Sequence, residues 1–326
     1  PDSEECQYVQ ELEQKAEQGD ESAQFALGSW YAEGRYVKPD YKLAIKWLEK
    51  AGKQGSDFSY FILGYHYNYG ENFPLSRQKA LEWYRKAAEL GDSSTQEILG
   101  DAYMYGDGFP QNTQLALEWY RRAAAQGLAE AQDAIGVMFM QGEGVSQDYQ
   151  QALAWYRKAA RQGLPAAQTH LGIMSAFGRG VAQSDRQAIA WYRKAAKQDF
   201  AKAQYQLGVA YSTGRGVPEN SRNALKWYLK AAEQGFTPAQ LALGEIYAHG
   251  RQGVPKDNKQ AYIWYYMASI YTEKSKDDCS ALIAERNRLK GTLTPDQLSE
   301  TYAAFDLIRR KINQSKEAKK IARKKY

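Results

Sequence analysis

Glycine and tryptophan recur through this chain at one constant spacing. Gly28 opens a series of seven glycines that lie 36 residues apart without a slip. Six tryptophans from Trp47 to Trp227 keep the same spacing, and Trp264 follows one residue late because the loop at 250–253 holds an additional residue. A fixed period of this length is the signature of a repeat architecture, so we expect an array of one structural unit.

Each unit has the pattern of two helices joined by a glycine-rich loop. In the fourth repeat Ala131, Ile135 and Phe139 form an i, i+4, i+8 stripe, which is helical spacing. Glycines then break the helix, since glycine accepts positive φ at a helix C-terminus. A second stripe follows, in which small residues permit close helix approach beside Gly136 and Trp155 fills the remaining volume. The predicted fold class is all-α, a solenoid of seven stacked helix-turn-helix repeats.

The residue seven positions before each phased tryptophan predicts where the second helix starts. All seven residues have short polar side chains that can accept bonds from the free amides of a first helical turn. They are Asp40, Ser76, Asn112, Asp148, Ser184, Asn220 and Asp257. Their identities vary while their capping ability does not, as a helix start requires.

The chain ends depart from the pattern, as terminal caps do. Residues 1–20 are predicted to form an N-terminal half-repeat whose helix covers 4–18. Residues 21–272 hold the seven repeats, 273–313 hold the C-terminal capping helices, and 314–326 form a basic tail.

Two capping helices are predicted after the last repeat. One lies near 278–289 and the other over 296–311, where it seals the open face of the seventh repeat. Thr294 is the expected N-cap of the last helix, Pro295 suits the first helical position, and Gln297 completes a capping box.

The unit AQxxLGxxYxxGxGVxxDxxxAxxWYxKAAxxG, nearly complete in residues 131–163 and 203–235, resembles the Sel1-like repeat, a relative of the tetratricopeptide repeat. The resemblance covers about residues 4–275. It implies a right-handed superhelix whose first helices line the concave side. The cysteine-rich branch of the family carries one disulfide per repeat, whereas this chain has only Cys6 and Cys279, so attributes of that branch do not transfer.

The resemblance also implies adaptor or scaffold binding, often in the bacterial periplasm or on bacterial surfaces. Some family members are immunity proteins that neutralise effectors, including lipid hydrolases, delivered by rival bacteria. We therefore expect a periplasmic or cell-envelope protein.

Four positions of each first helix face the concave side by this resemblance: three before the phased glycine, then one, four and five after it. The residues there that are predicted to bind a partner are Phe61, Tyr65, Asn68, Tyr69, Glu97, Asp101, Met104, Tyr105, Asp133, Met140, Phe177 and Tyr205. The five aromatic and methionine members in repeats two and three are expected to form one accessible patch with acidic neighbours. Such patches mark interfaces, and aromatic residues are typical anchors. The alternative is that some of these side chains pack into the superhelix interior.

The loops show a charge asymmetry at the residue after their first glycine. Repeats two to four carry acids there and the other four repeats carry arginine: Glu71, Asp107 and Glu143 against Arg35, Arg179, Arg215 and Arg251. This ridge either orients a partner electrostatically or is an ordinary solvated surface.

The net charge of +5 is matched by the tail, since residues 316–326 hold six basic residues and one acid. A remaining chain that is close to neutral does not indicate a nucleic-acid groove. The tail is interpreted as a solvated helix end, as a contact to anionic lipid or another acidic surface, or, less in keeping with the neutral body, as a nucleic-acid contact.

No residue pattern that carries chemistry stands out. His66, His170 and His249 are two or three repeats apart, which is too far to converge on one metal ion. No nucleophile, metalloprotease or Walker motif occurs, and the glycine-rich loops lack the preceding strand of a dinucleotide site. No catalytic residue, cofactor or metal is therefore predicted.

The leading hypothesis is a non-enzymatic protein, monomeric when free, that holds a protein partner on its concave groove. A narrower version is an immunity or inhibitor protein that covers the active site of an effector. Two alternatives stay open: a structural or adaptor component of a bacterial envelope assembly, and an envelope glycan-acting enzyme, against which the lack of a catalytic pattern argues. No run of eighteen apolar residues is present that could span a bilayer.

Overall fold

The computed structural model describes residues 3–70, 72–251, 253–272 and 280–324. Over these residues the chain forms 17 α-helices and no strand beyond an isolated bridge between Arg251 and Val254. The predicted all-α repeat fold is confirmed.

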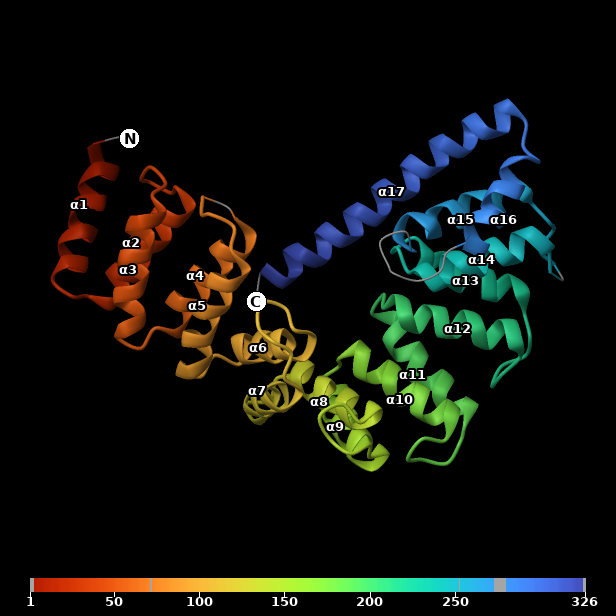
Figure 1. Ribbon diagram of the computed structural model, residues 1–326, viewed down its shortest axis with the longest axis horizontal. Helices are drawn as coiled ribbons and strands as arrows, with labels where there is room; N and C mark the ends of the chain where they lie inside the picture. The colour runs from red at the N-terminus through yellow and green to blue at the C-terminus, as the bar shows by residue number, and fades with distance from the viewer. Residues whose placement is uncertain (1–2, 71, 252, 273–279, 325–326) are drawn as a thin grey trace. The chain divides into compact units, whose positions relative to one another are not determined.

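The chain divides into two compact units, which we call unit 1 (Pro1–Gln162) and unit 2 (Gly163–Tyr326). In unit 1, α1 packs on α2, and helices α2 to α9 stack as four antiparallel pairs (Figure 1). The described helices of unit 1 are α1 (Ser3–Glu17), α2 (Glu21–Glu33), α3 (Tyr41–Lys53), α4 (Asp57–Tyr69), α5 (Arg77–Leu90), α6 (Ser93–Tyr105), α7 (Thr113–Ala125), α8 (Ala129–Gln141) and α9 (Tyr149–Arg161).

Unit 2 holds three further pairs and two terminal helices, α16 and α17, which pack against the last helix of the third pair. Its described helices are α10 (Pro165–Phe177), α11 (Asp185–Lys197), α12 (Ala201–Thr213), α13 (Ser221–Ala232), α14 (Thr237–His249), α15 (Asn258–Thr272), α16 (Ser280–Lys290) and α17 (Pro295–Lys324).

The second helix of every repeat begins where the capping residues predict. In α3 the side chain of Asp40 accepts from the amides of Lys42 and Leu43, and in α15 Asp257 accepts from Gln260 at 3.0 Å. The other five predicted caps likewise accept a first-turn amide through their side chains: Ser76, Asn112, Asp148, Ser184 and Asn220. All seven predictions are confirmed.

The phased glycine is the point of closest approach between the two helices of a repeat. A Cβ added at Gly100 of α6 would lie 2.4 Å from Cε1 of Tyr120 on α7, which is closer than two carbon atoms that are not bonded to each other can come. Five other phased glycines meet a tyrosine in the same way, and Gly28 meets Leu48. The ring that fills this space belongs to the residue after the phased tryptophan. The expectation that Trp155 fills it is corrected, because Gly136 meets Tyr156 at 2.6 Å.

Buried glutamines join consecutive repeats through side-chain amides. The Nε2 of Gln96 on α6 donates to the carbonyl of Ala88 at the end of α5, at 3.0 Å. Gln126, just after α7, donates to the Oε1 of Gln96 at 3.0 Å and to the carbonyl of Gly91 at 2.7 Å. Because helix ends leave backbone carbonyls without intrahelical partners, the bridge supplies donors to some of them. Equivalent bridges recur in repeats one, four, five and six.

The terminal helices agree with the sequence over most of their length. α1 corresponds to the half-repeat helix predicted over 4–18, and the described part of the helix predicted near 278–289 is α16, since 273–279 lie outside the described residues. At the start of α17 the amide of Gln297 donates to Thr294 Oγ1 at 3.2 Å, and the Thr294 amide donates to Gln297 Oε1 at 3.0 Å, which is the predicted capping box.

The predicted end of the last helix at residue 311 is wrong, because α17 continues to Lys324. Residues 312–324 contain neither glycine nor proline and consist largely of good helix formers, so no local signal stops the helix there. The buried side chains of Phe305 and Ile312 attach α17 to α15, in a cluster that includes Tyr262. The last helix therefore covers the open face of the seventh repeat, as predicted.

Candidate functional site

Four aromatic residues line one side of α4 in unit 1. Phe58, Phe61, Tyr65 and Tyr69 follow one another at intervals of three, four and four residues, which places them on a single helix face. Neighbouring ring centroids lie 5.7, 6.5 and 4.5 Å apart along this series. Phe25 of α2 extends it, with its ring 5.7 Å from that of Phe58. We call these five residues the aromatic stripe.

The aromatic stripe is anchored in the core at Phe61 and exposed to solvent at Phe58 and Tyr69. Phe61 is half-buried and lies 5.8 Å from the ring of Tyr84 in the hydrophobic core of unit 1. Phe58 is 52% exposed and Tyr69 is 47% exposed. Since aromatic side chains with few rotatable bonds lose little entropy on binding, a partly anchored row of rings is well prepared for contact.

Acidic and aromatic residues continue this surface on α6. Glu97, Asp101 and Tyr105 lie four residues apart, and the Tyr105 side chain is 74% exposed. The hydroxyl of the buried Tyr120 donates to Asp101 Oδ1 at 2.6 Å. Burial raises the pKa of Asp101, although the hydrogen bond from Tyr120 and the charge of Arg77 oppose this shift. We call the aromatic stripe together with Glu97, Asp101 and Tyr105 the unit-1 face.

Arg77, at the start of α5, ties the second repeat to the third beside this face. Its Nη1 donates to Oδ1 of Asn68 on α4 at 3.0 Å. Its Nε and Nη2 both lie 2.8 Å from Oδ2 of Asp107, in the loop after α6. The predicted contact residue Asn68 therefore has a structural role in unit 1.

Two of the residues predicted to bind a partner are buried. Met104 is 5% exposed and packs in the core with Leu117 and Tyr120, so its expected place in the accessible patch is wrong. Asp133 of α8 is 9% exposed. A helix side that holds the phased glycine faces its partner helix, and side chains near the edge of that side are drawn into the core. Met140 is half-buried.

The two predicted contact residues of unit 2 lie in different surroundings. Phe177 at the end of α10 is 59% exposed, and the guanidinium groups of Arg179 and Arg215 lie 5.4 and 5.9 Å from its ring centroid. Tyr205 of α12 is half-buried, with its ring 5.4 Å from Phe236.

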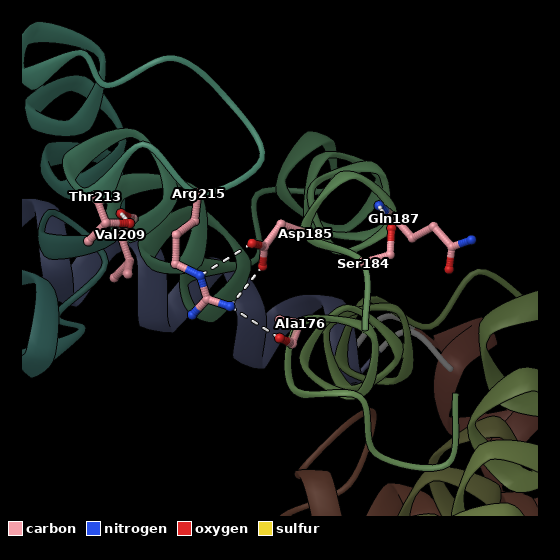
Figure 2. A network of polar contacts seen from close by, with 7 residues as sticks. All are labelled: Ala176, Ser184, Asp185, Gln187, Val209, Thr213 and Arg215. Atoms are coloured by element: carbon pink, nitrogen blue, oxygen red, sulfur yellow. Dashed lines mark hydrogen bonds and ion pairs between the residues drawn. The ribbon is translucent and has the colours of Figure 1, made fainter. Parts of the chain in front are cut away.

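Two of the loop charges, Asp107 and Arg215, take part in contacts between repeats. Arg215 lies 2.8 Å from Asp185 Oδ1 and donates to the carbonyl of Ala176 at 3.1 Å, as Figure 2 shows. Asp107 is paired with Arg77. The acidic position at Glu71 lies outside the described residues. At these positions the charge ridge is thus part of the repeat packing.

Sequence reasoning missed Phe58 and Tyr120. Phe58 lies six residues before the phased glycine, outside the four positions compared, although its spacing from Phe61 and Tyr65 was visible. Tyr120 belongs to the second helix, and only the fold brings its hydroxyl to Asp101.

Among the described residues, no three His, Cys, Asp or Glu side chains are grouped so as to hold a metal ion. Within that same part of the chain, no helix combines the length and hydrophobicity needed to cross a bilayer.

The sequence profile of the Sel1 repeat matches seven consecutive segments of the chain. They are residues 21–56, 58–92, 93–128, 129–164, 165–200, 201–236 and 237–269. The chain belongs to the Sel1 repeat family. The resemblance seen in the glycine and tryptophan spacing is confirmed.

Solved structures of other Sel1 repeat proteins have the same fold. A Sel1 repeat protein from Oxalobacter formigenes is 34% identical, with 87% of this chain and 80% of that chain covered and a TM-score of 0.72. Protein c5321, a protective antigen present in uropathogenic Escherichia coli strains and displaying an SLR fold, is 32% identical with a TM-score of 0.66. There the likeness covers 93% of this chain, which spans 63% of the length of c5321.

The immunity protein Pa5087 from Pseudomonas aeruginosa is more distant. It is 24% identical, with 60% of this chain and 75% of that chain covered and a TM-score of 0.47, and this likeness carries no functional information. A comparison with curated proteins gave no match.

Proposed function

We propose that this Sel1 repeat protein is a scaffold that binds a protein partner through the unit-1 face. The observation that carries the proposal is a row of rings that are exposed to solvent yet held in place by the core. Tyr105 is 74% exposed and Tyr69 is 47% exposed. Phe61 of α4 packs against the ring of Tyr84 on α5, which holds the row in place. Fully burying one large apolar side chain contributes about 1.5–3 kcal/mol, so a few such rings supply the energy of an interface hot spot.

The charges of this face favour a partner with basic residues. Among the first-helix positions that the resemblance assigns to the concave side, unit 1 has four acids and neither lysine nor arginine. Arg77, the nearby cation, is already paired with Asp107. Asp101 is partly removed from water, and a carboxylate in such surroundings attracts a cation more strongly than one in bulk solvent. We infer a partner segment with apolar side chains beside an arginine or lysine.

The test compares two triple variants. Tyr65, Tyr69 and Tyr105 are changed together to alanine, and the control changes Tyr8, Tyr41 and Tyr302, which are exposed tyrosines that do not belong to the unit-1 face. Each protein is used for affinity purification from the native organism, followed by mass spectrometry. We expect one partner that the native and control proteins capture and the first triple variant does not.

Far-UV circular dichroism melts of the three proteins accompany the capture. Undiminished capture by the first triple variant would refute the proposal. Equal loss of capture in both variants, with unchanged melts, would also refute it, because binding would then not depend on the unit-1 face.

An inhibitor of a secreted effector enzyme is the narrowest form of this proposal, with the cell envelope as the compartment. It requires the captured partner to be an enzyme whose activity falls to a low plateau once equimolar scaffold is added. If the enzyme stays active when it is saturated with this protein, the inhibitor hypothesis is contradicted, whereas the scaffold hypothesis is not. Cell fractionation tests the compartment.

A further inference from the structure

The near-neutral body of the chain is the sum of two oppositely charged units. Unit 1 contains 16 Lys and Arg against 24 Asp and Glu, a net charge of −8. Unit 2 contains 27 against 14, a net charge of +13. Without the tail from residue 316 onward, unit 2 still has 21 against 13, a net charge of +8. The charge of unit 2 is therefore a property of its repeats as well as of its tail.

The cations of unit 2 are concentrated on the solvent side of two second helices. α11 and α13 both pack against α12, and together they carry seven exposed basic residues. We call these residues the basic face: Arg186, Arg193, Lys194, Lys197, Arg222, Lys226 and Lys230. Arg186 and Arg222 are 36 residues apart, as are Lys194 and Lys230. Because these are equivalent positions of consecutive repeats, the basic residues of α11 and those of α13 form two rows on the same side of the array.

Two acids beside α11 and α13 are engaged with other cations. Asp185, the acidic residue within the bounds of α11, pairs with Arg215 at 2.8 Å. Glu233, at the end of α13, pairs with Lys311 of α17 at 2.7 Å. Within the bounds of α11 and α13 seven basic residues stand against one acid, so the basic face has an excess of positive charge.

A tryptophan lies beneath a lysine in each row. Lys194 Nζ is 4.4 Å from the ring centroid of Trp191, and Lys230 Nζ is 5.0 Å from that of Trp227. Both tryptophans are half-buried. The ammonium group of each lysine therefore lies over the face of a tryptophan ring, and lysine beside tryptophan is a combination suited to the boundary between headgroups and water.

We propose that the basic face of α11 and α13 docks this protein on the surface of an anionic phospholipid bilayer. Lysine and arginine side chains are attracted by the negative surface potential of such a membrane. Seven cations on two neighbouring helices present a broad layer of charge to a broad anionic surface, which provides the complementarity.

The same residues suit nucleic acid less well. Single-strand binders expose aromatic rings in a basic groove for base stacking, whereas Trp191 and Trp227 are covered by lysines. A helix that reads duplex DNA enters the major groove, whereas α11 and α13 each pack along one side against α12. The surface is also distinct from the unit-1 face, so membrane docking and partner binding are independent proposals.

The test uses the full chain and sedimentation with vesicles. Arg186→Gln, Lys197→Gln and Lys226→Gln are combined, and Lys194 and Lys230 over the tryptophan rings are kept. Vesicles of phosphatidylcholine with phosphatidylglycerol are compared with pure phosphatidylcholine at low and high salt. We expect binding to the anionic vesicles at low salt, weakened at high salt, and a decrease on the order of 100-fold in the partition coefficient of the triple variant, from about a fivefold effect per charge.

A matched control removes the same number of charges from the same repeat positions in unit 1. Lys42, Lys46 and Lys53 of α3 correspond to Arg186, Lys226 and Lys197 by whole multiples of 36 residues. Changing these three lysines to glutamine should leave vesicle binding nearly unchanged. An equal loss in both triple variants would overturn the assignment to unit 2.

Three further results would overturn the proposal. The first is equal binding to neutral and anionic vesicles. The second is full loss of binding on removal of residues 316–326 with no effect of the unit-2 triple variant, because the tail alone would then make the contact. The third is tighter binding to a DNA duplex than to anionic vesicles, lost in the same triple variant, which would assign the basic face to nucleic acid.

Discussion

Arg215 and Asp185 form an ion pair across two repeats, and the same pair occurs in unit 1 with its charges exchanged. Arg215, in the loop after α12, lies 2.8 Å from Asp185 at the start of α11, 30 residues earlier. In unit 1 the arginine is at the helix start, as Arg77, and the acid is in the loop 30 residues later, as Asp107, again at 2.8 Å. At these two junctions the contact joins opposite charges, and either order satisfies it.

Exchanging the unit-2 pair should restore part of the stability that each single change removes. Asp185→Arg and Arg215→Asp are each expected to lower the free energy of unfolding, and a partly exposed pair contributes about 0.5–1 kcal/mol of coupling. Recovery in the double variant should be incomplete, because an acid at a helix start also interacts favourably with the helix dipole. Urea unfolding of the four proteins gives the coupling energy, and additive effects would contradict the pairing.

Gly100→Ala should destabilise unit 1 although alanine favours helix. The gain in helix propensity is about 1 kcal/mol, whereas inserting a methyl group into a packed core costs about 1–3 kcal/mol. The new Cβ would lie 2.4 Å from the ring of Tyr120, so the cost wins. Thermal and urea unfolding measure the net effect.

Gly127→Ala is the comparison for this prediction. Gly127 has a φ of 95° and no neighbouring atom within 4 Å of an added Cβ, so any loss there comes from backbone strain alone. A Gly100→Ala protein as stable as the native chain would show that the close helix approach is not required.

Gln96→Ala should weaken the junction between the second and third repeats. The change removes two side-chain hydrogen bonds: the one that Gln96 donates to the Ala88 carbonyl, which keeps the Gly91 amide as a donor at 3.2 Å, and the one that Gln96 accepts from Gln126. Such a loss costs about 1–3 kcal/mol. Gln126→Ala, at an exposed side chain, should cost less, and unfolding of both variants in urea checks the order.

Alkaline solution should destabilise the repeats through their buried tyrosines. Burial raises the pKa of Tyr228 to about 12 and also raises the pKa of Tyr120 and Tyr156 above the ordinary value of 10. Above pH 10 the unfolded chain loses these protons before the folded chain does, so the free energy of unfolding falls as pH rises.

Parallel records of tyrosinate absorbance and circular dichroism test this prediction. The exposed tyrosines should titrate first without loss of helix, and the buried ones should ionise together with unfolding. Complete tyrosine ionisation below pH 11 in a fully helical protein would contradict it.

Asp101→Asn should raise stability at neutral pH while weakening partner capture. Burial raises the pKa of Asp101, so the folded state favours its neutral form and the ionised carboxylate is held at a cost above that pKa. An amide can still accept the Tyr120 hydroxyl but offers no charge to a partner. The stabilisation should therefore shrink as pH falls towards the carboxylate range. Unfolding at pH 7 and at pH 4 together with the capture assay tests both effects, and a variant less stable at pH 7 would contradict the first.

The accessible face of a repeat was only partly predictable, because neighbouring side chains decide burial. Positions around the phased glycine were assigned to one surface by analogy between repeats. In the structure Tyr105 is exposed to solvent, whereas Met104, the residue before it, lies in the core beside Tyr120. Which of two adjacent residues points inward depends on the rotation of α6 against α7, and that rotation is set by the contact between Gly100 and Tyr120.

The sequence by itself determined the repeat, its helix starts and the family. These follow from local chemistry: capping side chains act on amides two or three residues away, and glycine ends a helix at its own backbone angles. The tertiary structure alone decided which ring covers each glycine, which loop charge meets which helix start, and that Tyr120 supports Asp101. Those relationships join residues some 20 to 30 positions apart, and such distances are bridged only when the helices pack.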